Sequence, residues 1–261
     1  MPETLLFEIN DGLATITLNR PDNANALNLA MARRMADVAN QCEQDSAIRA
    51  VLLRANGKMF CAGGDLRAFA DSGPKIGGDL KQLTMYMHSA LSDLTRMQKP
   101  LVTSVHGAAA GAGFSIAICG DIVLAGESAH FTMAYTAAGL SPDGGSTFLL
   151  PRLGGLRLAQ ELMLTNRRLS SEEAAQRGLI TRVVADDELE TESLNVARQL
   201  AAGPTRAFGG VKTMLQTSMG AFESQMQLEA STIAHNASGT DGQEGISAFL
   251  ERRKPSFTGQ P

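Results

Sequence analysis

Two glycine-rich segments, each directly after a short apolar run, constrain this chain more than any other feature of its sequence. The first covers residues 60–66 (FCAGGDL) and follows the apolar run 50–53; the second covers residues 106–113 (HGAAAGAG) and follows the run 101–105. The apolar runs predict buried strands. Glycine and alanine after a strand allow a ligand to approach the backbone closely. They also leave backbone N–H groups free, and two such donors, one from each segment, would form an oxyanion hole.

The pattern between these segments predicts an α/β fold. Residues 5–9 and 13–18 flank Asn10-Asp11-Gly12, which indicates a hairpin near the N-terminus. Two further segments place apolar residues three or four positions apart, which is typical of helices with one buried face. These residues are Met31, Met35, Val38 and Cys42 in one segment and Leu80, Leu83, Met87, Leu91 and Leu94 in the other. Alternating strands and helices imply crossover connections and a mostly parallel sheet.

The last third of the chain has a different character. Ser170 and Glu173 form a capping-box pattern just before the final predicted strand, at residues 179–184. Beyond residue 186 the sequence predicts helix nearly to the end, with breaks at Gly203-Pro204 and near residues 239–242. We therefore expect a core at residues 1–195 and a helical segment at residues 196–261.

Composition excludes several classes of function. The chain has 261 residues and a net charge of -4, which gives no indication of nucleic-acid binding. Neither a secretory signal nor an apolar run long enough to cross a membrane is visible, so no membrane partner is expected. Cys42, Cys61 and Cys119 stand in apolar surroundings and are interpreted as reduced thiols of a cytoplasmic protein. No metal site is expected, because the histidines are far apart and lack paired cysteines: His88, His106, His130 and His235.

Several ordered segments resemble the enoyl-CoA hydratase/isomerase (crotonase) superfamily. Besides the two glycine-rich segments, they are residues 19–21 (NRP), 25–27 (NAL), 120–125 (GDIVLA), 139–145 (GLSPDGG), 150–154 (LPRLG), 174–180 (AAQRGLI) and 247–253 (SAFLERR). Together these segments, in this order, span nearly the whole chain. The resemblance implies a ββα spiral core at 1–195 and a C-terminal helical oligomerisation segment at 196–261. That segment builds a homotrimer in the family, and trimers often pair into hexamers.

The resemblance also assigns candidate binding residues. It places the two oxyanion-hole N–H donors on Gly64 and Ala112, where a thioester carbonyl would be polarised toward an enolate. The alternative is that these residues only permit tight packing of a helix on a strand. No cofactor is implied, because CoA is part of an acyl-CoA thioester substrate. The candidate substrate and CoA contacts are Arg20, Ala24, Ala26, Cys61, Ala62, Gly64, Asp65, Leu66, Gly111, Phe249 and Lys254.

The acid and base groups depart from those of typical hydratases in this superfamily. Those enzymes use two glutamates to activate water, and the matching positions here are Ser115 and Tyr135. The nearest candidate carboxylate is Asp143, in a Pro-Asp context similar to the ring-1,2-epoxyphenylacetyl-CoA isomerase branch and its Δ3/Δ2-enoyl-CoA isomerase relatives. One carboxylate can remove a proton from one carbon and return it to another. The alternative is that Asp143 caps a helix beginning near Gly144.

Two other residues are possible catalytic groups. His88 matches the catalytic histidine of 4-chlorobenzoyl-CoA dehalogenase, and Asp143 matches its nucleophile. In that enzyme, however, an aromatic residue stands at the position of Gly64 and a tryptophan at the position of Tyr135. Ser115 resembles a serine nucleophile in related spiral folds, but no histidine position matches the base that it would need.

These residues favour an acyl-CoA isomerase acting on a β,γ-unsaturated or ring-derived acyl-CoA, as in fatty-acid or aromatic-acid breakdown. Gly64 and Ala112 would hold the thioester oxygen, and Asp143 would move the proton. One alternative is a hydratase or dehalogenase that uses Asp143 with His88. Another is a non-catalytic acyl-CoA-binding or scaffold protein, since the two glutamates are missing.

Overall fold

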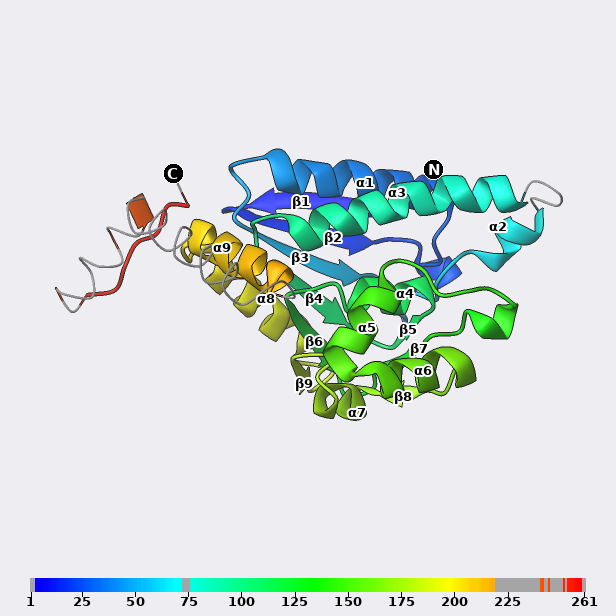
Figure 1. Cartoon of the computed structure of the whole chain (residues 1–261). Helices are drawn as coiled ribbons and strands as arrows, with labels where there is room; N and C mark the ends of the chain where they lie inside the picture. Colours follow the sequence, from blue (N-terminus) through cyan, green and yellow to red (C-terminus); the bar gives the residue numbers. More distant parts are fainter. Residues whose placement is uncertain are drawn as a thin grey trace.

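Two β-sheets organise the protein, seen in Figure 1 as a computed structural model that describes residues 3–71, 76–218, 240–241, 244, 251 and 253–259. The larger sheet has six strands in the order β1-β2-β3-β4-β6-β9, and the smaller has three in the order β5-β7-β8. The larger sheet contains β1 (Leu5–Asn10), β2 (Leu13–Leu18), β3 (Ala50–Ala55), β4 (Leu101–Val105), β6 (Ile122–Gly126) and β9 (Arg182–Val184). The smaller contains β5 (Ala108–Ala110), β7 (His130–Thr132) and β8 (Leu169–Ser170).

Parallel pairing confirms the α/β prediction and positions the two glycine-rich segments. All neighbouring strands of the larger sheet run parallel except β1 and β2, which form the predicted hairpin. Its turn holds Asp11 at φ 50° and Gly12 at φ 79°, as a tight hairpin turn requires. Since β3 pairs directly with β4, their carboxyl ends lie at the same edge of the sheet. Both glycine-rich segments therefore leave the sheet side by side.

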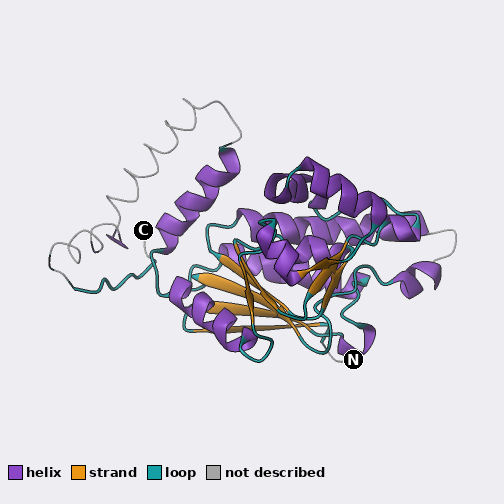
Figure 2. Cartoon of the chain, turned by 90° about the horizontal axis from the view of Figure 1, so that it is seen from below, coloured by secondary structure: helices purple, strands orange, loops and turns teal. Residues whose placement is uncertain are grey.

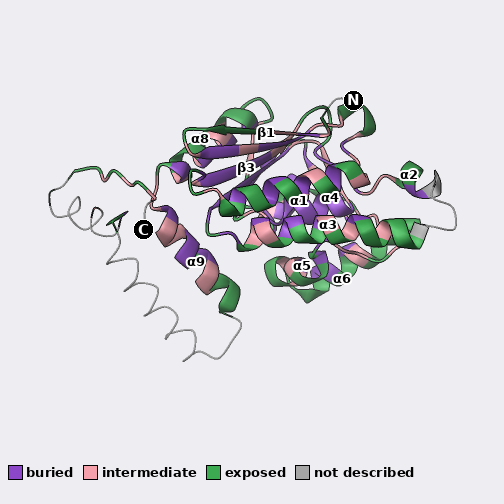
Figure 3. Cartoon of the chain, turned by 90° about the horizontal axis from the view of Figure 1, so that it is seen from above, coloured by how far each residue is buried: buried purple, intermediate pink, exposed green. Residues whose placement is uncertain are grey.

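Helices cover both faces of the larger sheet. Figure 3 shows α1 and α3 side by side on one face, whereas α8 packs on the opposite face against β3 and β4 (Figure 2). The helices are α1 (Leu29–Gln44), α2 (Leu66–Asp71), α3 (Ile76–Arg96), α4 (Ala112–Ala117), α5 (Ser146–Gly154), α6 (Leu156–Thr165), α7 (Ser171–Gln176), α8 (Leu189–Ala201) and α9 (Thr205–Thr217), with short 3₁₀ turns at Pro21–Asn23 and Thr136–Ala138.

Strand β3 shows how one sheet supports two cores. Val51 and Leu53 point into the larger core beneath α1 and α3, while Ala50 and Leu52 point into a smaller core beneath α8. All four are buried, because both faces of a parallel sheet are covered. The predicted apolar stripe of α1 is likewise fully buried, and that of α3 is buried except for the half-buried Leu80. The predicted helix start at Ser170 is confirmed, because its side chain accepts a hydrogen bond from the Glu173 N–H.

The C-terminal third leaves the sheet later than the sequence pattern suggested. The expected boundary between residues 195 and 196 falls inside α8, whose Ala197 and Ala201 still belong to the smaller core. The predicted break at Gly203-Pro204 separates α8 from α9. The second predicted break lies largely outside the described residues. In the part of the chain that is described, no helix combines the length and apolarity that a membrane crossing needs.

Two buried lysines fasten helices to the core. The Lys99 ammonium donates to the carbonyls of Cys42, Glu43 and Asp45 at 2.5, 2.9 and 2.7 Å, which caps the carboxyl end of α1. Burial lowers the pKa of Lys99. Lys212 of α9 lies 2.7 Å from Asp121 Oδ2 and donates to the Lys99 carbonyl at 2.9 Å. We call Lys99 and Lys212 the lysine anchors.

Candidate active site

A cavity of about 260 Å³ opens between the two glycine-rich segments, α2, α3 and the loop that precedes α5. Its walls are mainly apolar and include Leu66 and Phe69 of α2 and Leu83 and Met87 of α3. A few polar residues also line it, among them Tyr135, Ser141 and Asp143. An apolar chamber with a few convergent polar groups is the usual form of a small-molecule site.

Backbone pairing fixes the first glycine-rich segment against the second. The Cys61 N–H donates to the Ala108 carbonyl at 3.1 Å, and the Ala110 N–H donates back to Cys61 at 2.9 Å. A side chain at Gly63, where φ is 97°, would meet the Ala110 carbonyl oxygen at 2.8 Å. Glycine is therefore needed for the two segments to touch.

Two N–H groups remain available where the segments meet. Gly64 lies between Gly63, whose carbonyl accepts from Leu27 at 2.7 Å, and Asp65, whose N–H donates to Leu27 at 2.9 Å. Ala112 is the first residue of α4, after Gly111 at φ 53°. Across the described residues, neither the Gly64 nor the Ala112 N–H has a hydrogen-bond acceptor. Both residues line the cavity, so it holds two donors suited to an oxyanion.

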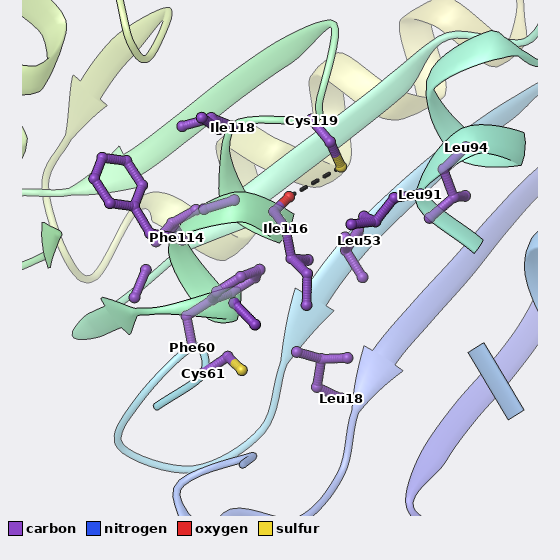
Figure 4. Close-up of a cluster of buried hydrophobic side chains, with 14 of the residues drawn as sticks. Leu18, Leu53, Phe60, Cys61, Leu91, Leu94, Phe114, Ile116, Ile118 and Cys119 are labelled. Atoms are coloured by element: carbon purple, nitrogen blue, oxygen red, sulfur yellow. Dashed lines mark hydrogen bonds between the residues drawn. The ribbon is translucent and has the colours of Figure 1, made fainter. Parts of the chain in front are cut away.

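The core holds α4 rigidly in place. Phe114 and Ile116 are fully buried, and Figure 4 shows them packed among side chains from the sheet and α3. The Phe114 ring contacts Phe131 with 5.1 Å between ring centroids. The direction of the Ala112 N–H is thus set by apolar packing behind it.

Asp143 is held by a tyrosine that the sequence suggested only as a possible catalytic group. The Tyr135 hydroxyl donates to Asp143 Oδ1 at 2.6 Å, and Ser115 Oγ lies 3.3 Å from the same hydroxyl. Ser115 Oγ also donates to the Asp143 carbonyl at 3.0 Å. Burial of the phenol, together with the adjacent Asp143 carboxylate, raises the pKa of Tyr135 far above its usual range. The hydroxyl therefore stays protonated and acts as a donor.

The helix-cap interpretation of Asp143 is wrong. Helix α5 begins at Ser146 after Gly145, and no side chain caps it. Asp143 contributes only its backbone carbonyl, which accepts from the Ser146 N–H at 3.2 Å. Gly144 and Gly145, at φ 62° and 75°, turn the chain before the helix starts and leave the carboxylate facing the cavity. A side chain at Gly144 would meet Ser115 Cβ at 2.9 Å, so this turn requires glycine.

His88 contacts the second carboxylate oxygen of Asp143, the one that Tyr135 does not bind. Its Nε2 is 3.5 Å from Asp143 Oδ2 and accepts a hydrogen bond from the Gly144 N–H at 3.2 Å. The side chain is 50% exposed, compared with 27% for Asp143. No third His, Cys, Asp or Glu of the described chain joins this pair to make a metal site. In the described structure no histidine hydrogen-bonds Ser115. The hydrogen-bond partners of the Ser115 hydroxyl there are the Tyr135 hydroxyl and the Asp143 backbone carbonyl.

The predicted CoA contacts near the N-terminus form one connected turn. The Arg20 guanidinium donates to the Ala26 carbonyl and to Asp65 Oδ2, the latter at 3.0 Å. The Ala62 N–H donates to the Ala24 carbonyl at 2.9 Å. These bonds hold the turn against the first glycine-rich segment. Arg20 is thus engaged within the protein, and its charge is balanced by Asp65.

The remaining predicted contacts lie away from the cavity or outside the described residues. Cys61 is fully buried, its side chain joins the core (Figure 4), and burial raises the pKa of its thiol to about 12. Only its backbone is available to shape the site. Lys254 is exposed, and Phe249 lies outside the described residues.

Sequence reasoning missed Phe69 and gave Met87 a purely structural role. Phe69 places its ring 2.7 Å from the position that a Gly64 Cβ would occupy. Met87 belongs to the predicted buried stripe of α3, yet it also lines the cavity. No sequence signal marks Phe69, whereas the closeness of Met87 to His88 could have indicated that this turn of α3 faces the site.

Comparisons with known proteins agree with this architecture. The sequence matches the enoyl-CoA hydratase/isomerase family over residues 8–260. It is 38% identical over 265 residues to the 1,2-epoxyphenylacetyl-CoA isomerase of Escherichia coli (strain K12), covering 100% of both chains. It is 32% identical over 247 residues to the 4-chlorobenzoyl coenzyme A dehalogenase-2 of an Arthrobacter species, covering 94% of this chain and 87% of that one.

The solved structures show the same fold. The crystal structure of an enoyl-CoA hydratase from Polaromonas sp. JS666 superposes with a TM-score of 0.91 at 31% identity, covering 97% of this chain and 99% of that one. The architecture is therefore the crotonase fold. The names of these three relatives state three different reactions, so the fold alone does not select one.

Proposed function

Because the chain belongs to the enoyl-CoA hydratase/isomerase family, we propose that it is an acyl-CoA isomerase. Its substrate would be a β,γ-unsaturated or ring-derived acyl-CoA thioester, as arises in the breakdown of fatty or aromatic acids. One observation carries the proposal: Asp143 is the single carboxylate among the described residues that line the cavity. One carboxylate suffices for a proton shuttle, whereas the hydratase mechanism of this family uses two.

In the proposed reaction the thioester oxygen lies between the Gly64 and Ala112 N–H groups. These donors are fixed before the substrate binds, because backbone pairing holds Gly64 and core packing holds Ala112. Donors of this kind typically contribute about 3–4 kcal/mol each to stabilising an oxyanion. They would lower the barrier to removing a proton from the α-carbon, which is next to the thioester carbonyl.

Asp143 then moves the proton. Oδ2 accepts a proton from one carbon of the acyl chain, and the C–H electron pair delocalises toward the thioester oxygen. The same proton returns to another carbon, and the double bond moves without oxidation or reduction. Tyr135 supports this assignment, because it holds Oδ1 at 2.6 Å and leaves Oδ2 as the reactive oxygen.

CoA would lie along the turn at residues 20–26 and the first glycine-rich segment. We place the adenine and pantetheine part of CoA against the Arg20–Ala26 turn and the thioester against residues 61–66. The support is that Ala62, Gly64 and Leu66 line the cavity and that backbone bonds join this loop to the turn. Lys254 is a candidate partner for a CoA phosphate.

A dehalogenase is the second candidate, supported by one specific contact. His88 Nε2 lies 3.5 Å from Asp143 Oδ2, and the Arthrobacter relative acts, by its name, on 4-chlorobenzoyl coenzyme A. In such an enzyme Asp143 would attack the ring, chloride would leave, and His88 would activate the water that releases the product. A water-adding hydratase has less support, because Ser115 and Tyr135 occupy the two glutamate positions.

A panel of CoA thioesters tests these candidates on the purified full-length protein. The panel contains a 3-enoyl-CoA, a 2-enoyl-CoA, the ring-1,2-epoxide of phenylacetyl-CoA and 4-chlorobenzoyl-CoA. An isomerase converts the first or third to an isomer of unchanged mass. Chloride release would instead establish the dehalogenase, a mass gain of one water on the 2-enoyl-CoA would establish the hydratase, and no turnover at all would favour a binding or scaffold protein.

We also propose that the C-terminal segment mediates assembly into a homotrimer or a dimer of trimers. Helix α9 supports this, because its Val211 and Leu215 are 49% and 68% exposed although both are large and apolar. Light scattering on the full chain and on a chain ending at Gly203 tests the proposal. A truncated chain that remains trimeric would contradict it.

A further inference from the structure

We propose that His88 is a proton exit, through which Asp143 exchanges its proton with water in a second cavity. The inference rests on the proposed function, because it requires Asp143 to carry a proton during turnover. It assigns a use to a histidine that the isomerase mechanism does not need.

The second cavity lies next to the Gly144–Gly145 turn, which directly follows Asp143. It has a volume of about 390 Å³ and is lined by α3, the Gly144–Gly145 turn, α5 and Gln216 of α9. His88 lines this second cavity but not the first, whereas Asp143 lines the first but not the second. The contact of 3.5 Å between His88 Nε2 and Asp143 Oδ2 therefore joins two separate chambers.

A backbone hydrogen bond sets the tautomer of His88. The Gly144 N–H donates to Nε2 at 3.2 Å, so Nε2 carries a lone pair and the ring proton of the neutral imidazole is on Nδ1. In this state Nε2 cannot donate to Asp143. It can, however, receive a proton from Asp143 once the carboxylate has removed one from the substrate.

The exchange balances without any other reactant than water. The O–H bond of protonated Asp143 breaks, an Nε2–H bond forms, and the Gly144 N–H releases Nε2. The imidazolium, whose side chain is 50% exposed, then passes its Nε2 proton to water and takes up a solvent proton on the same nitrogen, and the reverse transfer carries that solvent proton to Asp143. This route competes with direct return of the original proton to the acyl chain, so the product carries a share of solvent hydrogen.

A direct route through the first cavity is the alternative. Asp143 is 27% exposed, so bound water in the substrate chamber could exchange with it before the acyl chain does. The two routes predict different results when His88 is changed, because only one of them passes through the imidazole.

The test measures deuterium in the product per turnover when the full-length enzyme isomerises a 3-enoyl-CoA in D2O. We expect wild type to incorporate deuterium and His88→Gln to lower incorporation per turnover by about tenfold or more, since a positioned proton acceptor typically accelerates transfer about 10²–10⁴-fold. Glutamine still offers an oxygen to the Gly144 N–H but cannot take up a proton at neutral pH. Ser92→Ala is the matched control, because Ser92 lines the same cavity one helical turn away. It should retain wild-type incorporation.

Chemical rescue separates a relay from a structural effect. In His88→Ala, added imidazole should enter the second cavity and restore incorporation toward the wild-type ratio, whereas a misplaced Asp143 would not respond. Unchanged incorporation per turnover in His88→Gln would overturn the proton exit and leave the isomerase intact. Wild-type turnover that incorporates no solvent deuterium would also overturn the proton exit and leave the isomerase intact. Absence of both turnover and exchange with every acyl-CoA tested would overturn the exit together with the proposed function.

Discussion

The lysine anchors and Asp143 are both partly or fully removed from water, but their hydrogen bonding differs. Lys99 donates to three carbonyls, and Lys212 pairs with Asp121 and donates to the carbonyls of Lys99 and Leu94. Among the described residues, the Asp143 carboxylate accepts one short hydrogen bond, from Tyr135 to Oδ1 at 2.6 Å. In the same described part of the chain, the polar partner of its Oδ2 is the imidazole of His88, at 3.5 Å.

This difference separates structural charge from reactive charge. An ammonium whose donors are all used stabilises the fold and has no capacity left for a ligand. A carboxylate with one oxygen held and the other nearly free is oriented and still able to accept a proton. Mutations should therefore divide cleanly, with rate effects at Asp143 and its neighbours and stability effects at the anchors.

Asp143→Asn should produce the largest effect. The amide oxygen can still accept from Tyr135, but the side chain cannot accept a proton, so kcat for a 3-enoyl-CoA should fall about 10²–10⁴-fold. Asp121→Asn is the matched control, because it makes the same chemical change at a lysine anchor and should leave kcat unchanged. A continuous absorbance assay measures kcat of each variant, and a thermal melt checks that each variant is folded. Wild-type turnover in Asp143→Asn would contradict the proton shuttle.

Gly64→Pro tests the oxyanion hole, with Gly64→Ala as its partner. Both substitutions push a Cβ against the Phe69 ring, at 2.7 Å in the present geometry, but only proline removes the N–H. The proline variant should have a kcat about 10²–10³-fold below that of the alanine variant, the usual cost of losing one such donor. Circular dichroism checks that both variants fold. Equal rates would remove Gly64 from the oxyanion hole.

Tyr135→Phe should have a smaller effect on rate. The carboxylate loses its 2.6 Å hydrogen bond and becomes free to rotate, so kcat should fall about tenfold with little change in KM, corresponding to about 1.4 kcal/mol. Ser115→Ala is the control, because it removes contacts with the tyrosine hydroxyl and the Asp143 backbone carbonyl but none with the carboxylate. If KM rises and kcat stays constant, Tyr135 binds substrate rather than positioning Asp143.

The structural features that depend on local sequence patterns were predicted from the sequence. The buried strands, the hairpin turn at Asp11-Gly12 and the apolar stripe of α1 follow from periodicity and turn chemistry, and all were observed. The two glycine-rich segments were identified because a strand followed by glycine constrains the backbone locally. Parallel pairing of β3 and β4 then brings the segments together.

The rest depends on contacts between residues distant in the chain. The direction of the Asp143 carboxylate follows from the turn at Gly144–Gly145 and from Tyr135, so a local capping rule gave the wrong answer. Cys61 stands in a binding loop yet points into the core. Lysines in helices or loops usually lie on the surface, so nothing in the sequence distinguishes Lys99 or Lys212 as buried.

Lys212→Met should change stability and leave the rate alone. Methionine fills much of the space of the lysine stem but removes the ammonium from Asp121 and from the Lys99 carbonyl. Hydrogen bonds to charged groups contribute about 1.5–3 kcal/mol. The Asp121 side chain is 32% exposed, so water offsets part of the loss, and the free energy of unfolding should fall by about 1–3 kcal/mol. Urea denaturation measures this.

The matched control for Lys212→Met is Lys81→Met, an exposed lysine of α3 for which we expect a change within about 0.5 kcal/mol. The kinetics of Lys212→Met test whether this lysine anchor also affects the proton exit at His88. Gln216 follows Lys212 by one turn of α9 and lines the second cavity beside His88, so the anchor and the proton exit share a helix. Unchanged kcat with unchanged solvent deuterium would show that the anchor is purely structural. Lower deuterium incorporation at the same kcat would instead show that Lys212 holds α9 where the second cavity needs it.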